Sequence, residues 1–394
     1  MHAPDRPKLL HAIRARFREA WGDPAPRCFF APGRVNLVGA HLDYNGGDVL
    51  PMAVDRGVYV AARLRTDGRI RLCSIDQPLV VEVDGSQVGT RTKPEWGWAG
   101  YPLGVWHTYG HRTGKAAGVD LVFGGDLPIG AGLSSSAAIE VATAVALDTL
   151  HGTGLDRQQL ALLAHRAENG FVGLRCGIMD QFASALGKPG HVLWLHCSGP
   201  RWEHVPFDGT ACEVLVMDTR KPRLLAKTGF NERVAQCAKA HEVLRAQVRD
   251  LPHLADYAMA DLEQVRDAMD DVLYRRAHHV IGEMRRLGRG VAALRASDFP
   301  ALGAVLNESH RSTAVDYEVS CEELDVITDA ARSCEGVYGA RLTGAGFGGC
   351  AIALVAPGRA AEVAARVGER YRARIGMDAG FDLLRNGPGP GEVG

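Results

Sequence analysis

Runs of strand-forming residues alternate with helical runs along the whole chain, and this alternation restricts the fold more than any other feature of the sequence. Branched and apolar residues gather at residues 58–64, 119–123 and 350–355, as they do in buried strands. Apolar residues recur at helical spacing over residues 136–150 and 158–172. The same signals predict further strands at residues 80–83, 191–196 and 213–218, and further helices at 231–248 and 272–286. The sequence therefore predicts a mixed protein of the α+β class.

The length of the chain indicates more than one structural unit. With 394 residues it is longer than a single hydrophobic core usually supports, so we expect two mixed α/β lobes with a ligand site in the cleft between them. Strand signals become sparse after about Asp218, and we place the boundary within residues 197–207. The predicted lobes are residues 1–200 and 201–385. Residues 386–394 are rich in glycine and proline and are expected to form a flexible tail.

Charge and cysteine content exclude several classes of partner. The 45 Lys and Arg residues balance 46 Asp and Glu residues, so the chain lacks the basic footprint of a nucleic-acid or membrane-surface protein. We find no segment long and apolar enough to span a bilayer. The nine cysteines form no C-x-x-C pair, which favours reduced thiols in a cytoplasmic protein over disulfides or zinc. We expect a cytoplasmic monomer with small-molecule partners.

A glycine- and serine-rich loop at residues 128–138 carries the first chemical signal. Gly130 and Gly132 allow backbone conformations in which successive N–H groups converge on an anion. Three serines then begin an alanine-rich helix, whose N-terminal N–H groups and dipole favour phosphate. The hydroxyls could cap that helix or reach a Mg²⁺ ion on a nucleotide. The same composition also fits a plain turn and helix cap, so neighbouring motifs must decide.

Two acidic residues on the elements that follow support the phosphate interpretation. Glu168 closes a helical segment, and Asp180 comes twelve residues later in the run from Cys176 to Phe182. A phosphate-binding loop, a metal-type carboxylate and a possible base then lie on consecutive elements. This combination indicates phosphoryl transfer to a small molecule.

Other phosphate-loop motifs fit less well. The chain contains no G-x-x-x-x-G-K-[ST] run, which excludes a Walker-type site. Gly344, Gly346 and Gly349 satisfy G-x-G-x-x-G, but the predicted strand follows them instead of preceding them, so a dinucleotide site is disfavoured. A glycine loop beside a bound phosphate fits better.

A second polar cluster lies within residues 32–47. Asn45-Gly46 is a tight-turn signal. Ahead of it, His41 and Asp43 would point the same way on an extended backbone and offer a donor and an acceptor to sugar hydroxyls. Taken singly, each of these two residues is more often a turn or surface residue.

Together these motifs resemble the galactokinase family, within the GHMP class of small-molecule kinases, from about Arg27 to Val355. The matching runs are Gly33-Arg34-Val35-Asn36-Leu37 with Asp43-Tyr44-Asn45, Leu127-Pro128 through Ser136-Ala137-Ala138, and Leu342-Thr343-Gly344-Ala345-Gly346-Phe347-Gly348-Gly349. The resemblance implies the GHMP kinase fold, with the active site in the cleft between two lobes. It also implies an ATP-dependent kinase that phosphorylates the anomeric hydroxyl of a galactose-configured sugar.

The resemblance further implies a role for each matching position. Asp180 would take the proton from the anomeric hydroxyl, and Arg34 would hold Asp180 ionised and steady the transferring phosphoryl group. Ser136 and Glu168 match the positions that bind Mg²⁺. The ATP phosphate loop would comprise Gly130, Ala131, Gly132, Leu133, Ser134, Ser135 and Ser136. The sugar would be contacted by Ala40, His41, Leu42, Asp43, Gly177, Arg223 and Phe230.

The chain departs from the family pattern on the sugar side. Ala40 and Leu42 stand where the family normally reads Glu and Thr, so the acid that takes the C6 hydroxyl is missing. Arg223 and Phe230 stand where the family has His and Tyr. Plant galacturonokinases resemble this chain in having alanine at the first position, which removes a like charge from a C6 carboxylate. D-Galacturonate is therefore the substrate we favour, with D-galactose as the alternative and another sugar as a third possibility.

A non-catalytic sugar and ATP sensor is the alternative from another class. Family members of that kind resemble galactokinases with a damaged serine loop, whereas Ser134, Ser135 and Ser136 are all present here. The intact loop favours an enzyme.

Overall fold

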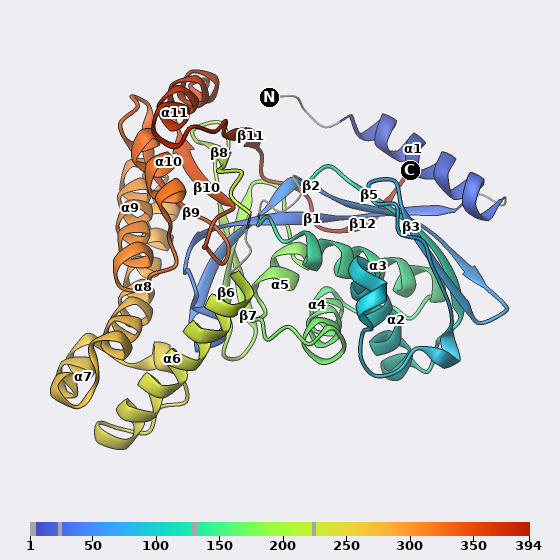
Figure 1. The fold of residues 1–394 in the computed structure, drawn as a ribbon, viewed down its shortest axis with the longest axis horizontal. Helices are drawn as coiled ribbons and strands as arrows, with labels where there is room; N and C mark the ends of the chain where they lie inside the picture. Colours follow the sequence, from blue (N-terminus) through green and yellow to red (C-terminus); the bar gives the residue numbers. More distant parts are fainter. Residues whose placement is uncertain (1–4, 23–25, 128–131, 223–225) are drawn as a thin grey trace.

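The structure is a computed structural model that describes residues 5–22, 26–127, 132–222 and 226–394. Its strands form two sheets, which Figure 1 shows with most of the helices packed around them. The first sheet contains β1 (Arg27–Val38), β2 (Asp48–Arg65), β3 (Arg69–Ser74), β4 (Val81–Asp84), β5 (Gly118–Gly125), β6 (His191–His196), β7 (Arg201–Pro206) and β12 (Gly391–Val393). The second contains β8 (Glu213–Asp218), β9 (Val337–Leu342), β10 (Cys350–Val355) and β11 (Gly380–Leu384).

The long strands β1 and β2 organise the first sheet. Its strand order is β12-β1-β2-β5-β3-β4, and the β6–β7 hairpin joins through the start of β2, where Asp48 pairs with His196. The second sheet has the order β11-β8-β10-β9 and is antiparallel throughout. Several strands match the sequence prediction closely, and β6, β8 and β10 have the predicted bounds. The mixture of sheets and helices confirms the predicted α+β class.

In Figure 1, α1 lies above and α2 to α5 lie below the first sheet, α8 to α11 lie beside the second, and α6 and α7 lie at the lower left. Their bounds are α1 (Arg6–Trp21), α2 (Gly100–Thr113), α3 (Ser135–His151), α4 (Arg157–Arg166), α5 (Met179–Ala185), α6 (Ala226–Gln247), α7 (Met259–Gln264), α8 (Asp271–Arg295), α9 (Phe299–Val315), α10 (Glu322–Arg332) and α11 (Ala360–Ile375). A π-helical segment, η4 (Ala167–Val172), continues directly from α4. Among the described helices, none has both the length and the apolar character needed to cross a membrane.

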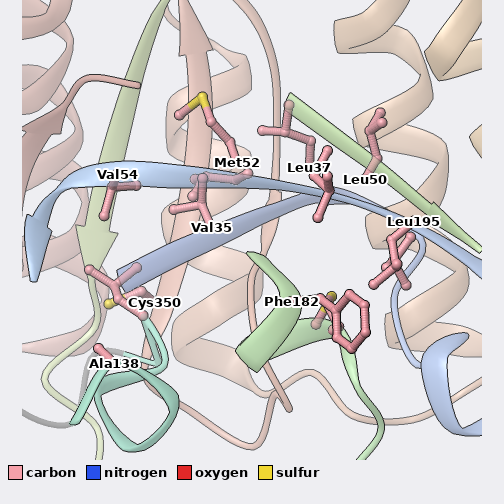
Figure 2. Close-up of a cluster of buried hydrophobic side chains, with 14 of the residues drawn as sticks. Val35, Leu37, Leu50, Met52, Val54, Ala138, Phe182, Leu195 and Cys350 are labelled. Atoms are coloured by element: carbon pink, nitrogen blue, oxygen red, sulfur yellow. The ribbon is translucent and has the colours of Figure 1, made fainter. Parts of the chain in front are cut away.

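The larger of two hydrophobic clusters among the described residues includes side chains of both sheets, and the smaller one packs α1 against the first sheet. Figure 2 shows side chains of β1 and β2 meeting Phe182 of α5, Leu195 of β6 and Cys350 of β10. Val35, Leu37, Leu50 and Met52 have no exposed surface. Because α5 begins one residue before Asp180, this packing fixes the position of a candidate catalytic residue.

Two predictions about chain organisation need comment. The predicted lobe boundary between residues 200 and 201 stays a prediction. In the structure, β7 of the first sheet ends at Pro206 and β8 of the second sheet begins at Glu213. The predicted flexible tail is wrong, because β12 pairs with β1 at the sheet edge, with Cys28 opposite Val393. Glycine and proline supply little side-chain surface for a core, but backbone pairing at an open sheet edge does not require it.

Candidate active site

Arg34 and Asp180 form the centre of the candidate site. Arg34 donates to Asp180 through Nε at 2.8 Å and through Nη2 at 2.9 Å, and the Ser134 hydroxyl donates to the same carboxylate at 2.5 Å. The Arg34 side chain is 5% exposed and that of Asp180 is 30% exposed. A two-point contact to a planar guanidinium holds a carboxylate in one orientation. The carboxylate therefore faces accessible space in a fixed position.

The phosphate loop is attached directly to this pair. Arg34 donates through Nη1 to the Gly132 carbonyl at 2.7 Å, and its backbone N–H donates to the Leu133 carbonyl at 3.0 Å. A side chain at Gly33 would place its Cβ 2.6 Å from that same Leu133 oxygen, so the close approach requires glycine. Ser134 precedes α3 in a left-handed conformation, with φ of 59°.

These residues line a cavity of about 530 Å³. One part of its lining belongs to β1, the phosphate loop with the start of α3, and α5, and the other part belongs to the end of β8 and to loops beside the second sheet. The lining residues are Arg34, Gly132, Ser134, Ser135, Ser136, Asp180, Asp218, Arg220, Lys221, Pro222, Gly344 and Ala345. Gly344 and Ala345 belong to the glycine loop that the sequence placed near a phosphate. Asp218 ends β8, and Arg220, Lys221 and Pro222 follow it; these residues were not predicted from the sequence, although polar residues at the end of a buried strand were a usable signal. Lys221 pairs with Glu323 at 2.7 Å.

Glu168 lies on η4 within hydrogen-bonding distance of two other side chains. Its Oε2 accepts from Gln181 Nε2 at 2.6 Å and lies 3.1 Å from Cys176 Sγ, and Ser136 lies close enough to influence the pKa of its carboxyl group. Burial raises the pKa of Glu168, while the neighbouring side chains of Cys176, Gln181 and Ser136 oppose that rise. The structure thus brings together Ser136 and Glu168, the two predicted metal ligands.

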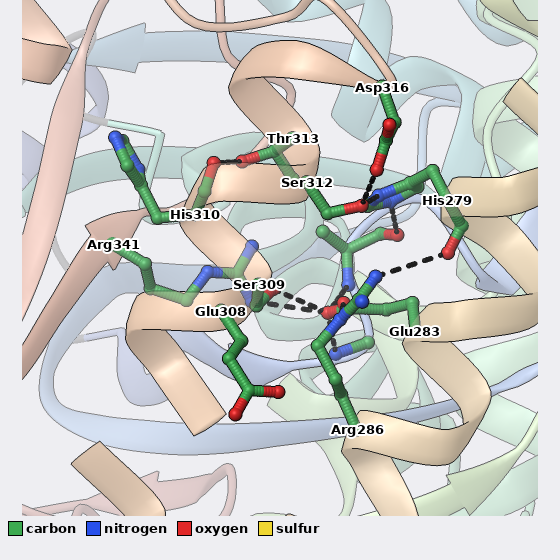
Figure 3. A network of polar contacts seen from close by, with 12 residues as sticks. His279, Glu283, Arg286, Glu308, Ser309, His310, Ser312, Thr313, Asp316 and Arg341 are labelled. Atoms are coloured by element: carbon green, nitrogen blue, oxygen red, sulfur yellow. Dashed lines mark hydrogen bonds and ion pairs between the residues drawn. The ribbon is translucent and has the colours of Figure 1, made fainter. Parts of the chain in front are cut away.

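A buried polar network lies behind the turn that carries Ala40 (Figure 3). Glu283 of α8 accepts from the backbone N–H groups of Gly39 at 3.0 Å and Ala40 at 3.1 Å, and His279 donates to the Ala40 carbonyl at 3.1 Å. Burial opposes ionisation of Glu283, but Arg286, His279 and Arg341 outweigh it and lower its pKa to about 2. The backbone of Ala40 is therefore held at both ends by helix α8.

Asp43 and Gly177 are in direct contact. A Cβ added at Gly177 would lie 2.1 Å from Oδ2 of Asp43, so only glycine fits there. Burial, reinforced by the Asp180 carboxylate, raises the pKa of Asp43 to about 6. The Asp43 carboxyl is thus close enough to Asp180 for the two charges to influence each other.

His41 belongs to an aromatic group with Tyr44, Phe230 and Tyr317. His41 Nδ1 lies 2.8 Å from the Tyr44 hydroxyl, which is 2.8 Å from the Tyr317 hydroxyl. The Phe230 ring centre lies 5.1 Å from that of Tyr44 and 6.1 Å from that of His41. Burial, together with His279 and Arg341, lowers the pKa of His41 to about 3. Its Nε2 is buried and finds no hydrogen-bond partner within the described part of the chain.

The turn differs from the extended backbone on which His41 and Asp43 were expected to point the same way. His41 has a left-handed φ of 59°, and Asp43 begins a 3-10 turn, η1 (Asp43–Asn45). Gly46, with φ of 77°, closes the predicted tight turn. Leu42 is fully buried in the hydrophobic core. The predicted site residues Gly130, Ala131 and Arg223 lie outside the described residues.

Comparison with known proteins agrees with this geometry. Family models match the chain at residues 100–188 for the GHMP kinase N-terminal domain, at 291–373 for the GHMP kinase C-terminal region, and at 15–64 for the galactokinase galactose-binding signature. A mevalonate kinase from Methanococcus jannaschii shares the fold with a TM-score of 0.66 at 18% identity, covering 92% of this chain and 98% of that one. Fold and site together define a small-molecule kinase of the GHMP class, as the sequence predicted.

More similar proteins narrow this class. A galactokinase from Exiguobacterium sibiricum is 40% identical over 382 residues, covering 96% of each chain, and one from Bacillus subtilis is 38% identical, covering 98% of this chain and 99% of its own. The structure of Lactococcus lactis galactokinase complexed with galactose superposes with a TM-score of 0.93 at 35% identity, covering 98% of this chain and all of that one. The chain belongs to the galactokinase family. These relatives do not support the preference for galacturonate that Ala40 suggested, and they favour the galactose alternative.

Proposed function

We propose that the chain is an ATP-dependent kinase that transfers the γ-phosphate to the anomeric hydroxyl of D-galactose, giving galactose 1-phosphate. The observation that carries the proposal is the Asp180 carboxylate, fixed by Arg34 and Ser134 at the edge of the phosphate loop. Phosphoryl transfer needs mainly alignment, a base for the incoming hydroxyl and positive charge near the transferred group. This arrangement supplies all three within one cavity.

Each residue has a distinct part in this mechanism. Asp180 accepts the anomeric proton. Arg34 orients Asp180 and, because it is also bonded to the Gly132 carbonyl, keeps the base in register with the phosphate loop. Ser135 and Ser136, the first residues of α3, line the cavity, and a helix N-terminus favours phosphate.

The oxygens of Ser136 and Glu168 suit a Mg²⁺ ion. Mg²⁺ prefers hard oxygen ligands and is commonly held by one or two carboxylates together with substrate phosphates. The influence of Ser136 on the pKa of Glu168 supports this assignment, because it requires the two side chains to lie close together. When bound there with ATP, the ion offsets phosphate charge during transfer.

The chemistry of His41 supports galactose over galacturonate. A C6 carboxylate would call for a cation, but the lowered pKa of His41 keeps its ring neutral at physiological pH. A neutral imidazole nitrogen that has no partner among the described residues suits a hydroxyl group. Phe230 lacks the hydroxyl of the family tyrosine and packs against Tyr44, so His41 and Asp43 are left as the polar groups of this turn that can contact the sugar.

The test is a coupled assay for ADP release with D-galactose, D-galacturonate and other hexoses, with the product identified by phosphorus NMR. We expect kcat/KM for galactose to exceed that for galacturonate by at least about tenfold, because a C6 carboxylate beside the ionised Asp43 and the neutral His41 would be desolvated and repelled. A preference for galacturonate would overturn the choice of sugar. Tight binding of sugar and ATP without ADP release would favour a sensor instead.

A further inference from the structure

A single side-chain amide joins the three elements that surround the reaction centre. Nε2 of Gln181 donates to Glu168 Oε2 at 2.6 Å and to Glu140 Oε2 at 3.0 Å. Glu168 lies on η4, Glu140 on α3 and Gln181 on α5, directly after Asp180. The amide therefore links the proposed metal carboxylate to the helix that begins at the phosphate loop.

The burial of Glu140 calls for an explanation. Glu140 and Gln181 have no exposed surface, and Glu140 Oε1 and Gln181 Oε1 find no hydrogen-bond partner within the described residues. A buried carboxyl group with so few hydrogen bonds costs free energy, and apolar side chains of similar volume often replace such groups without loss of stability. Stability alone therefore gives no reason for an acid inside α3 at this point.

We propose that Glu140 is a positioning residue, which acts through Gln181 to hold the Glu168 carboxylate in the orientation that binds Mg²⁺. This proposal rests on the kinase function and on the assignment of Glu168 to the metal. Glu140 lies one helical turn after Ser136, the other proposed ligand, so both ends of the Glu140–Gln181–Glu168 chain of contacts are attached to the metal site. Groups that orient metal ligands in this way typically alter metal affinity by about 10- to 100-fold when they are removed.

The geometry explains why Gln181 needs this second contact. The Gln181 side chain has several rotatable bonds, and its amide must present an N–H to Glu168. Glu140 accepts the other N–H of the same nitrogen and so prevents the amide from turning its oxygen toward the Glu168 carboxylate. Without Glu140, one of these amide N–H groups would be buried without an acceptor, and the carboxylate would lose a fixed donor.

Three variants distinguish a positioning role of Glu140 from a role in packing alone. Glu140→Leu fills the space without a polar group, and Glu140→Gln keeps an acceptor for Gln181. Thr143→Val is the matched control, because Thr143 is also fully buried on α3 but its hydroxyl bonds only to the Ile139 carbonyl in the same helix. Circular dichroism and thermal unfolding establish that each variant is folded.

The readout is the affinity for a non-hydrolysable ATP analogue, measured by calorimetry with and without Mg²⁺. We expect Glu140→Leu to weaken binding by about tenfold in the presence of Mg²⁺ and to leave metal-free binding unchanged. Glu140→Gln and Thr143→Val should stay within about twofold of wild type, a change of under 0.5 kcal/mol. The Mg²⁺ concentration for half-maximal ADP release should rise in parallel for Glu140→Leu.

A double-mutant cycle distinguishes a shared path from two separate defects. Because Glu140 acts through Gln181, adding Gln181→Leu to Glu140→Leu should weaken Mg²⁺-dependent binding no further than Gln181→Leu does alone. Additive losses, or an unchanged Mg²⁺ response in Glu140→Leu, would overturn the proposal. If the wild-type protein bound the ATP analogue equally tightly with and without Mg²⁺, that result would instead contradict the assignment of Ser136 and Glu168 as metal ligands.

Discussion

The proposed catalytic side of the active site and its proposed sugar side differ in how completely their polar groups are hydrogen-bonded. On the catalytic side, defined by Arg34, Ser134 and Asp180, each charged group already has a partner, and the residues sit on β1, on α5 and at the start of α3. On the sugar side, defined by the turn from Ala40 to Asp43, His41 Nε2 finds no hydrogen-bond partner among the described residues, and Asp43 has a raised pKa.

This difference shows where substrate binding is required to complete the site. The proposed base and the proposed phosphate loop are assembled before the sugar arrives, so we expect the chemistry to depend little on rearrangement there. The turn is held from behind by Glu283 and His279, whereas His41 Nε2 has no hydrogen-bond partner within the described part of the chain and is available to a ligand in our proposal. Changes on the catalytic side should therefore lower kcat, and changes on the sugar side should raise KM.

The largest effect is expected for Asp180→Asn. An amide cannot take the anomeric proton, so kcat should fall by roughly 10² or more, the usual contribution of a general base. Steady-state kinetics gives kcat, and calorimetry should show that nucleotide binding is retained. Near-normal turnover would assign Asp180 a purely positional role.

Glu168→Ala should act on the metal and spare the sugar. Loss of the carboxylate should raise the Mg²⁺ concentration needed for half-maximal activity by roughly 10-fold or more. Galactose affinity, measured separately, should change little because no hydrogen bond links Glu168 to the sugar-side turn among those found. An unchanged Mg²⁺ requirement would return Glu168 to a structural role.

Gly177→Ala should affect the sugar side most. Its new Cβ would lie about 2.1 Å from the Asp43 carboxylate, so Asp43 must move. Displacing one hydrogen-bonding group of a buried site costs roughly 1–3 kcal/mol, which corresponds to about a 5- to 150-fold rise in KM for galactose. Gly173→Ala is a suitable control for the same loop because its added Cβ meets nothing within 4 Å, although its φ of 83° adds some strain. Equal KM values for the two variants would refute the contact-based explanation.

The smallest effect concerns pH and Asp43. With a pKa of about 6, the Asp43 carboxyl is ionised at pH 7 and largely protonated at pH 5. Galactose affinity should therefore fall by at most roughly tenfold as pH drops across this range, since the ionised fraction falls about that much. Stability should change in the opposite direction, because the folded state binds this proton more tightly than the unfolded chain, so ionisation destabilises the fold as pH rises through 6. Asp43→Asn should remove both trends. A pH-independent affinity in wild type would contradict a role for this carboxylate in sugar binding.

Sequence patterns indicated which residues meet around Arg34 and Asp180 better than they indicated the conformation of the Ala40–Asp43 turn, and the reason is physical. Gly33, the serine loop and Asp180 serve local backbone and charge requirements, and such requirements are visible in short motifs. The conformation of the turn depends on α8, which lies more than 200 residues away, and on the charge of His41, which burial sets. The alanine at position 40, where the family normally has glutamate, therefore led to a prediction of galacturonate that the relatives do not support.

Two other features were beyond the reach of sequence patterns. Glycine and proline in residues 386–394 predicted a loose tail, but pairing of β12 with β1 depends on an open sheet edge that only the folded chain presents. Glu140 and Gln181 meet only because α3 packs beside α5. The position of Glu140 in the helical pattern of α3 does not indicate that its side chain contacts Gln181.

A crystal structure with galactose and a non-hydrolysable ATP analogue tests the central comparison most directly. The account predicts that the anomeric oxygen lies about 3 Å from the Asp180 carboxylate, as a base requires. It also predicts that the Arg34–Asp180 pair keeps its present geometry and that His41 Nε2 gains a hydrogen bond from the sugar. A different hydroxyl placed against Asp180, or a rearranged Arg34–Asp180 pair beside an unchanged sugar side, would contradict it.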